Sequence, residues 1–389
     1  MKQSTAIIFC VIANVILASA DVWSQPVVTK SNSSNAFNPS IGLILNGTYS
    51  SFDNDPEDYE IPGFALGEET DPGARGFSLG ETELSIKANV DERFYGSATI
   101  ALTPEGAAEV EEAYLETLAL GEGFTIKAGR FFSGAGYLNS VHAHAWDFVD
   151  QPLVYRALLG NQLGDDGIQG RWVAPTDVFV ELGGEVLRGD GFPAGGADHD
   201  GTGTSVVFIH VGGDMNVSNS WRAGAAHINA SAMERETGDT PDVFTGDSKV
   251  NIIDLVWKWA PLGNPVERNA KVQFEYFTRS EDGTFDTIDY NGDQSGWYLQ
   301  GVYQFMRKWR AGVRHDALQA DDVGVALAGT VLDNQGHDPS RTSVMVDYSN
   351  SEFSRVRLQF NKDDSGPESD NQWYVQYLMS LGAHGAHQF

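Results

Sequence analysis

Apolar and polar side chains alternate along most of this chain, from about residue 37 to the C-terminus. Clusters of Gly, Asp, Asn and Pro separate the alternating segments from one another. A side-chain period of two is the pattern of a β-strand with one apolar and one polar face. Apart from a short helix expected between residues 140 and 159, no segment with the helical period exceeds three turns. The pattern therefore predicts an all-β protein.

The alternation predicts sixteen strands, an even number. Their ranges are 41–51, 77–90, 94–102, 108–118, 124–131, 167–173, 177–188, 205–213, 220–230, 249–259, 270–280, 296–305, 309–316, 342–348, 353–362 and 372–389. Every second connection is long and acidic, with one short exception at 103–107; the long ones are 52–76, 132–166, 189–204, 231–248, 281–295, 317–341 and 363–371. The others are generally short and include 91–93, 119–123, 174–176, 306–308 and 349–352. This layout is typical of a transmembrane antiparallel β-barrel with long external loops and short periplasmic turns.

Aromatic residues gather beside the short connections: Trp172, Trp221, Trp257, Trp259, Phe305, Trp309, Tyr348 and Phe353. Indole and phenol rings are stable where apolar chain meets water, so these residues are expected to form one interfacial girdle. The alternative is a water-soluble β protein in which they fill the end of the core.

Single strands carry one face for lipid and one for water. In 309–316, Trp309 and Val313 alternate with Arg310 and Arg314. The segment 353–362 has the same pattern, with Arg355 and Arg357 on its polar face. In 249–259 the inward face is mixed and holds Ile252, Asp254, Val256 and Lys258. Because every backbone group in lipid must be paired, the last strand is expected to pair with the first.

The N-terminus has the three parts of a secretory signal peptide: Lys2, an apolar stretch at 6–17, and small residues at 18–20. The alternative is a short buried helix. Cleavage would leave a mature chain that begins near Asp21, contains no cysteine once Cys10 is removed, and has no disulfide framework. The expected organisation is a signal peptide (1–20), a short N-terminal segment (21–36) and a barrel (37–389).

Acidic residues outnumber basic ones, with 54 Asp and Glu against 25 Lys and Arg. Phosphate binding is dominated by basic residues, so duplex nucleic acid is not an expected partner. Most of the acidic residues fall in the expected external loops, where they could bind divalent ions that bridge lipopolysaccharide. The net charge therefore does not settle the ion preference of a channel.

Two short motifs flank the third external loop. Gly129, Arg130 and Phe131 end one strand, and the sequence Asp-Gly-Ile-Gln at 166–169 begins the next. Here the chain resembles outer-membrane porins, more narrowly the phosphate-selective porin family, and the barrel pattern over 37–389 supports the likeness.

A closer resemblance, carried by NPSIGLILNGTYSSF, DPEDYEIPGF, HAHAWDFVDQPLVYR and LGAHGAHQF, is to a group of uncharacterised bacterial outer-membrane proteins. Some of these are labelled zinc-regulated or TonB-dependent receptors. A TonB-dependent receptor needs a plugged barrel of about 22 strands, and we expect no room for a plug ahead of the first strand.

The porin resemblance implies that the third loop folds inward and narrows the lumen. The loop residues that would line this constriction are His142, His144, Asp147, Asp150 and Arg156. The basic wall residues opposite them would be Lys258, Arg310, Arg314, Arg355 and Arg357. Rings of charge in a narrow pore set its ion preference. The alternative is that these arginines do not act on passing ions but form salt bridges that hold the loop against the wall.

His142 and His144, with Asp147 nearby, could also contact a divalent metal, since residues two apart in an extended chain share a face. Solvated or hydrogen-bonded loop histidines are the alternative. The acidic segment 286–296 lacks the spacing of a calcium loop. No nucleotide loop or catalytic triad is recognisable, so no enzyme activity and no cofactor are expected.

We therefore expect an outer-membrane, porin-like channel for small polar or ionic solutes. The alternatives are a specific channel or receptor for a metal ion such as zinc or its chelate, and a barrel-borne enzyme or adhesin. The expected partners are outer-membrane lipid, lipopolysaccharide and the solute. Since porins of this size are often trimers, the resemblance also implies a homotrimer.

The chain ends in LGAHGAHQF, with His384 and His387 three residues apart. On a strand this spacing places them on opposite faces, so they are not expected to hold one metal ion. The terminal Phe389 matches the aromatic residue with which outer-membrane barrels typically end, and by resemblance it would act as an assembly signal.

Overall fold

The computed structural model describes residues 39–67, 70–103, 106–195, 201–237 and 242–382. Its elements, in chain order, are β1 (Ser40–Phe52), η1 (Pro56–Asp58), β2 (Gly76–Ser78), β3 (Thr82–Asn89), β4 (Phe94–Leu102), β5 (Ala108–Thr117), β6 (Phe124–Phe132), η2 (Ala143–Ala145), α2 (Leu153–Leu159), β7 (Gly164–Val173), β8 (Phe179–Leu187), β9 (Thr204–Asn216), β10 (Asn219–Thr237), β11 (Asp242–Trp259), η3 (Pro261–Gly263), β12 (Asn269–Phe285), β13 (Ile288–Met306), β14 (Trp309–Ala320), η4 (Val325–Leu327), β15 (Ser340–Ser351), β16 (Ser354–Asp364) and β17 (Asp370–Gly382).

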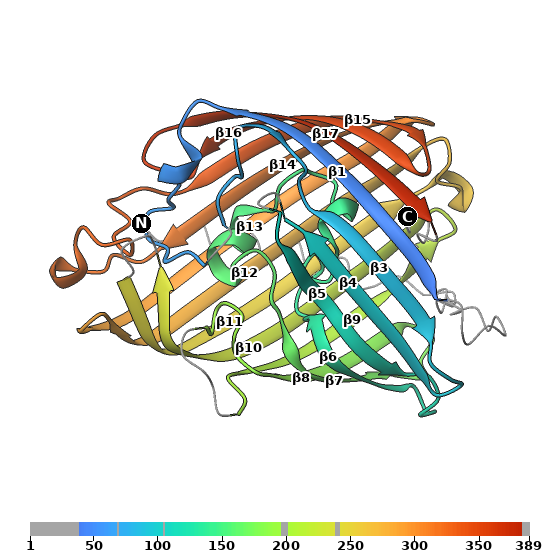
Figure 1. Cartoon of the computed structure of the whole chain (residues 1–389), viewed down its shortest axis with the longest axis horizontal. Helices are drawn as coiled ribbons and strands as arrows, with labels where there is room; N and C mark the ends of the chain where they lie inside the picture. The colour runs from blue at the N-terminus through green and yellow to red at the C-terminus, as the bar shows by residue number, and fades with distance from the viewer. Residues whose placement is uncertain (1–38, 68–69, 104–105, 196–200, 238–241, 383–389) are drawn as a thin grey trace.

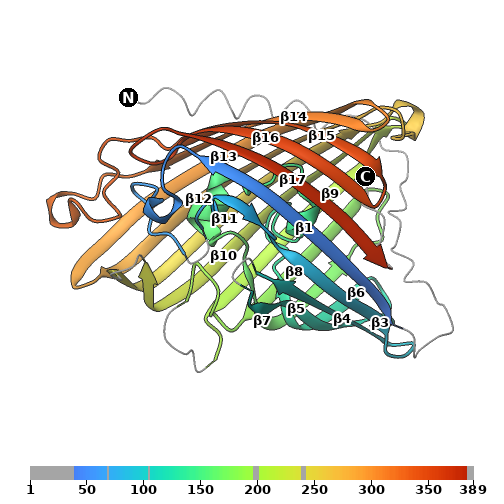
Figure 2. The same cartoon turned by 45° about the horizontal axis from the view of Figure 1, so that its top comes forward.

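The sheet closes on itself, as the sequence predicts. β1 pairs antiparallel with β17, from Gly42 opposite Gly382 to Phe52 opposite Gln372. Figures 1 and 2 both show the blue first strand beside the red last one. A closed sheet leaves no unpaired edge, which is what a lipid environment demands.

The wall has sixteen strand positions although the described residues form seventeen strand segments. β2 and β3 both pair with β1 and together occupy one position, which corrects the single strand expected at 77–90. Thr48 lies opposite Ser78, whereas Ile44 lies opposite Glu83, so the register shifts by one residue across the break. Such an irregularity is a β-bulge, which bends a strand and turns its side chains to new directions.

The two faces of the wall differ as the alternation predicts. Val313 is 52% exposed on the outside, and Arg314, the next residue of β14, is 1% exposed on the inside. Leu358 and Arg357 of β16 repeat this relationship. The aromatic residues expected in a girdle lie in or beside the ends of the strands next to the short turns. The wall thus has an apolar outer face and a polar lining.

Two of the expected long loops are wrong. The segments 231–248 and 281–295 belong largely to strands, because β10 to β13 continue past the wall as long hairpins. The second hairpin turns at Asp286, whose φ of +54° suits a tight turn. Outside a bilayer the outward face of a hairpin can be polar, as at Asp247 and Asp282, so the apolar outer face that marks a wall strand disappears while the backbone pairing continues.

The loop between β6 and β7, residues 133–163 and here named L3, lies inside the barrel and contains η2 and α2. The short helix expected between residues 140 and 159 is therefore confirmed. α2 ends at Gly160, whose left-handed conformation (φ 57°) is easily adopted by glycine. Within the described residues, no helix has the length and apolar character needed to cross a bilayer.

The expected signal peptide, the N-terminal segment up to residue 38 and the C-terminal stretch 383–389 lie outside the described residues. Predictions about Cys10, His384, His387 and Phe389 therefore stay predictions.

Candidate constriction of the lumen

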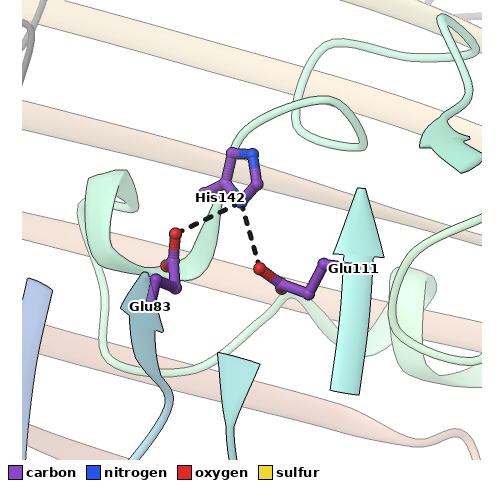
Figure 3. A group of neighbouring side chains, drawn as sticks. All are labelled: Glu83, Glu111 and His142. Atoms are coloured by element: carbon purple, nitrogen blue, oxygen red, sulfur yellow. Dashed lines mark ion pairs between the residues drawn. The ribbon is translucent and has the colours of Figure 1, made fainter. Parts of the chain in front are cut away.

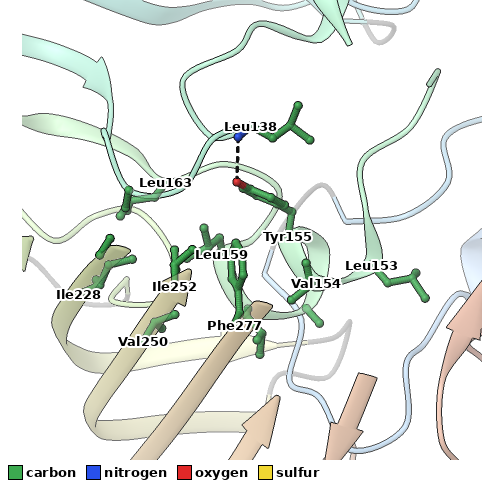
Figure 4. Packing of buried hydrophobic residues seen from close by; sticks show 14 of the residues in the cluster. Leu138, Leu153, Val154, Tyr155, Leu159, Leu163, Ile228, Val250, Ile252 and Phe277 are labelled. Carbon is green, nitrogen blue, oxygen red and sulfur yellow. Dashed lines mark hydrogen bonds between the residues drawn. The ribbon is translucent and has the colours of Figure 1, made fainter. Parts of the chain in front are cut away.

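An apolar cluster fixes L3 against one side of the wall (Figure 4). Leu153, Val154, Leu159 and Leu163 of L3 pack with wall residues of β10, β11 and β12, among them Ile228, Val250, Ile252 and Phe277. This contact explains the apolar residues that mix with polar ones on the inward face of β11, since Ile252 faces L3 and not open water. Burial of such side chains stabilises the docked loop by about 1.5–3 kcal/mol each.

A buried carboxylate on the wall holds the middle of L3. The Tyr155 hydroxyl donates a hydrogen bond of 2.9 Å to Glu275 of β12 and accepts one of 3.2 Å from the backbone N–H of Leu138. Glu275 also accepts hydrogen bonds from Tyr298 (2.5 Å) and from the backbone N–H of Tyr137 (2.9 Å). Because these donors satisfy a fully buried carboxylate, they fix both the helix and the chain before it.

Farther along the wall, beyond β13, Asp150 of L3 meets basic residues of β14 and β15. Its carboxylate lies 2.8 Å from guanidinium nitrogens of Arg314 (β14) and Arg341 (β15). It also accepts hydrogen bonds from Gln359 (2.6 Å) and Asn361 (2.9 Å), both on β16. Two cations and two amides thus surround one buried carboxylate, an arrangement that offsets the cost of removing its charge from water.

Asp147 makes a second such contact nearer the short-turn end. It forms ion pairs with Lys271 of β12 and, at 3.1 Å, with Arg310 of β14. Arg310 is shared with Asp347 of β15 at 2.6 Å, and Arg357 lies 3.5 Å from that same carboxylate. The structure therefore places Arg310, Arg314 and Arg357 in salt bridges. This is the second of the two roles that the sequence analysis gave for the wall arginines.

The wall arginines also bind the backbone of L3. Arg355 donates to the carbonyl of His144 at 2.9 Å, and Arg357 donates to the carbonyl of Trp146 at 2.9 Å. Among the described residues, Arg355 has no carboxylate within ion-pair distance. Its charge is therefore not neutralised by direct pairing.

Arg156 and Lys258 are placed differently from the other candidates. Arg156 lies with its guanidinium 5.6 Å from the ring centre of Tyr59, a residue of the first long loop, and its Nη1 has no hydrogen-bond partner in the described part of the chain. Lys258 lies near the short-turn end of β11, opposite Ser220 and Lys271. It makes no ion pair with L3 within the described residues.

The histidines face the other half of the wall, where acidic residues gather. The Nε2 atom of His142 lies 3.0 Å from Glu112, and its Nδ1 lies 3.4 Å from Glu83 and 3.5 Å from Glu111. His144 contacts Glu83 through Nδ1 at 2.5 Å. The rings of His142 and His144 are stacked with centroids 5.8 Å apart, whereas Asp147 is held by basic residues elsewhere. L3 therefore bridges an acidic and a basic side of the lumen.

The electrostatics of L3 follow from these partners. Burial alone would raise the pKa of the Asp150 carboxyl, but Arg341 and Arg314 outweigh it and hold the pKa below its usual range. Lys271 and Arg310 do the same for the pKa of Asp147. Burial would lower the pKa of His142, yet the neighbouring carboxylates of Glu111, Glu112 and Glu83 raise it well above the ordinary value.

Two cavities lie at the ends of the same stretch of wall. One, of about 370 Å³, opens at the long-loop end beside Tyr59 and Asp363. The other, of about 480 Å³, opens at the short-turn end beside Arg310 and Arg355. We name the cavity at the short-turn end the inner cavity and the one at the long-loop end the outer cavity. On β16, Arg355 lines the inner cavity and Asp363 lines the outer one. Gln359 and Asn361 lie between these two residues on the strand and bind Asp150. L3 thus contacts the wall between the two cavities.

Several residues of this site are absent from the sequence prediction. They are Glu83, Glu111, Glu112, Lys271, Glu275, Asp316, Arg341 and Asp347. Arg341 is the last residue of an expected loop. No strand alternation therefore predicted that its side chain would point into the lumen. The first long loop also enters the lumen, where Ile61 and Phe64 pack on the L3 cluster, and no sequence signal suggested this.

Comparisons with solved structures identify similar barrel folds. The fold is similar to that of an outer membrane protein of Vibrio cholerae, OmpT in its loop L8 deletion form, with 16% identity, a TM-score of 0.57, and 88% of this chain and 99% of that chain covered. It is also similar to an anion-selective porin from Comamonas acidovorans, with 10% identity, a TM-score of 0.56 and coverage of 88% and 99%. The outer membrane channel DcaP of Acinetobacter baumannii shares 12% identity, with a TM-score of 0.53 and coverage of 88% and 97%.

The fold is therefore a closed antiparallel barrel of sixteen strands with a loop folded inside, and it is similar to the fold of the outer-membrane barrels named above. No family model matches the chain. A protein of Aquifex aeolicus, described only as an uncharacterized protein, is 31% identical over 393 residues, which cover 92% of this chain and 81% of that protein. The chain belongs to the same family as this Aquifex protein.

Proposed function

We propose that this protein is an outer-membrane channel through which small polar or ionic solutes diffuse, with L3 as the constriction. The observation that carries the proposal is the position of L3 between the two cavities, tied to charged residues of a closed barrel. Charged side chains at a narrow point act on passing ions at short range, where solvent screening is weak.

The inner cavity supports a preference for anions at the short-turn end. Its basic lining residues are Arg307, Lys308, Arg310 and Arg355, and among the described residues Glu352 is the one acidic residue of its lining. The outer cavity has the opposite character, with Asp55, Asp58, Glu60, Asp363, Glu368 and Asp370 in its lining. A solute would therefore pass from an acidic mouth to a basic one, and the charge of the narrow zone between them would decide which ions pass.

The surroundings of the barrel are part of the same proposal. The apolar outer face would contact outer-membrane lipid, and the acidic outer hairpins and loops would bind divalent ions that bridge lipopolysaccharide. A trimer form of OmpT exists among the similar structures, and we propose a homotrimer as the assembly. Targeting by a cleaved signal peptide belongs to the proposal as well.

One observation favours the metal-ion alternative, a channel or receptor specific for a divalent cation. His142 and three glutamates gather on the acidic side of the lumen. This group would retain a divalent cation entering the pore.

Single-channel recording of the full-length, refolded protein in a planar bilayer tests the proposal. We expect discrete conductance steps and an anion-to-cation permeability ratio that changes when wall arginines are replaced. Protein that is folded, as judged by its heat-sensitive electrophoretic mobility, but gives no conductance would refute the channel function.

A further inference from the structure

His142 of L3 and two glutamates of the wall converge on one point in the lumen (Figure 3). Glu83 comes from β3, Glu111 from β5, and one ligand atom of each of the three residues lies within 4.8 Å of the others. In the described part of the chain, this is the one group of three such side chains with that spacing. The group differs from a purely acidic cluster because its centre is an imidazole nitrogen.

The distances fit a shared cation better than hydrogen bonds. His142 Nδ1 lies 3.4 Å from one Glu83 oxygen and 3.5 Å from one Glu111 oxygen. Within the described residues, neither His142 Nδ1 nor Glu111 Oε2 has a partner with hydrogen-bond geometry, although both atoms are buried. Ligands bound tetrahedrally to an ion at about 2.0–2.1 Å stand about 3.3–3.4 Å from one another. His142 Nδ1 and Glu111 Oε2 thus lie about as far apart as two ligand atoms of one metal ion.

The surroundings orient these atoms as a metal site requires. The other ring nitrogen of His142 lies 3.0 Å from Glu112, and this contact fixes the ring and turns Nδ1 towards Glu83 and Glu111. Metal-binding histidines commonly hold a carboxylate through their second nitrogen in this way. His144 contacts Oε1 of Glu83 at 2.5 Å. This contact orients the Glu83 carboxylate so that its other oxygen, Oε2, faces His142.

The charge balance also calls for a cation. Among the described residues, the ion pairs of Glu83, Glu111 and Glu112 involve the two histidines and no Lys or Arg. Asp147 and Asp150 on the basic side each have two such cations. With side-chain exposures of 12% for Glu111 and 18% for His142, an ion in the lumen can reach the group.

From this geometry we propose that His142, Glu83 and Glu111 bind one divalent transition-metal ion, which links L3 to β3 and β5. Mixed imidazole and carboxylate ligands suit ions such as Zn²⁺ and not Mg²⁺, which prefers six oxygens. Water completes the coordination. The site goes beyond the channel function, because it can exist whether or not the barrel conducts.

The test is equilibrium dialysis of the full-length protein, refolded in detergent and stripped with a chelator, against Zn²⁺ alone. We expect one Zn²⁺ per chain, not displaced by excess Mg²⁺. His142→Ala and Glu111→Gln should each weaken binding at least tenfold, since each removes a proposed ligand. Glu112→Gln keeps the ligands but weakens the contact to the imidazole, and should weaken binding by roughly tenfold to a hundredfold.

The matched control is His210→Ala. His210 is also a buried lumen histidine, 3.0 Å from a single carboxylate, Glu181, and 3.1 Å from the carbonyl of Gly134. This variant should bind Zn²⁺ as the unchanged protein does. Co²⁺ bound to the unchanged protein should show the visible absorption of a tetrahedral site, so the test does not depend on variants that fold.

No Zn²⁺ binding by the folded protein would overturn the metal site and leave a simple ion-paired histidine. Equal binding by the unchanged protein and by folded His142→Ala or Glu111→Gln would overturn it too, because the ion would then sit elsewhere. Since dialysis needs no ion flow, failure here is distinct from a failure to conduct in the bilayer.

Discussion

The carboxylate of Asp150, in the middle of L3, lies 2.8 Å from a guanidinium nitrogen of Arg341 on β15, and both residues are buried. The pair joins the inward loop to the basic side of the wall at the level between the two cavities. Its position makes it the first target for a test of whether L3 controls passage.

We expect Asp150→Asn to lower the free energy of unfolding by about 1.5–3 kcal/mol, because it removes the carboxylate shared by Arg314 and Arg341. The loss is limited because both arginines still lie within 3.6 Å of Asp316. The same change should release L3 from the wall and increase single-channel conductance. Urea unfolding in detergent, followed by tryptophan fluorescence, and bilayer recordings measure the two effects. The control is Lys362→Ala, which removes an ion pair whose lysine is 59% exposed and should cost less than about 1 kcal/mol. Equal effects of both variants would contradict a structural role for Asp150.

Tyr155→Phe removes one oxygen atom from the contact between α2 and Glu275. The variant removes the acceptor of the Asn139 N–H and one of the two acceptors of the Leu138 N–H, which keeps Glu275 at 3.1 Å. It also leaves the buried Glu275 carboxylate with one donor fewer, so we expect a loss of about 1–3 kcal/mol in unfolding free energy. Tyr303→Phe, on the exposed outer face of β13, is the control and should change stability by less than about 0.5 kcal/mol. If both variants have the same stability, the phenol of Tyr155 does not hold L3.

The contacts that Asp147 and Asp150 make with the basic side of the wall should depend on pH only in acid. The pKa values of Asp147 and Asp150 in the folded protein lie below their ordinary values because the neighbouring cations stabilise the carboxylates. The stability that these two groups contribute is complete above the unfolded pKa of about 3.9 and is lost as the pH falls towards the folded values. Stability and conductance should therefore be insensitive to these groups from pH 7 down to about 5, with the loss of stability below that range. Asp150→Asn should show a shallower acid dependence, and an equally steep one would exclude Asp150 as a source.

Arg355 is the wall residue best placed to act on a passing ion, since it lines the inner cavity and has no carboxylate partner among the described residues. We expect Arg355→Gln to lower the anion-to-cation permeability ratio by on the order of twofold to tenfold, which corresponds to about 0.4–1.4 kcal/mol. Reversal potentials in a salt gradient measure the ratio. Lys362→Gln removes the same charge from the outward face of the same strand and should leave the ratio unchanged. A similar shift in both variants would mean that surface charge, and not the cavity, sets the preference.

Most of the barrel could be predicted from the sequence, because lipid on one side and water on the other impose a period of two on every wall strand. Val313 and Arg314 show this most simply, as adjacent residues with opposite surroundings. The prediction was wrong where that constraint ends. The hairpins β10–β11 and β12–β13 continue beyond the wall with a polar outward face, and their inward face mixes buried Phe244 and Phe285 with charged residues, so these strands lack the apolar outer face of the wall.

The candidate site was only partly predictable. The loop residues could be named from a resemblance, but not their partners, since these come from strands up to about two hundred positions away, as with Asp150 and Asn361. Nothing local in the sequence indicates that His142 meets acidic strands while Asp150 meets basic ones.

The sequence by itself determined the all-β class, the closed wall and its two faces, because these depend on local alternation and on the need to pair every backbone group in lipid. The tertiary structure alone decided the chemistry of the lumen. Glu111 and Glu112 are consecutive and would point to opposite faces of a regular strand, yet both contact His142. The register between β4 and β5 shifts there, with Thr99 opposite Glu112 and Ile100 opposite Val110, so Glu111 has no partner. This bulge turns both side chains towards L3. The bulge arises from the way β4 and β5 pair, and the alternation of apolar and polar residues along one strand does not encode that pairing.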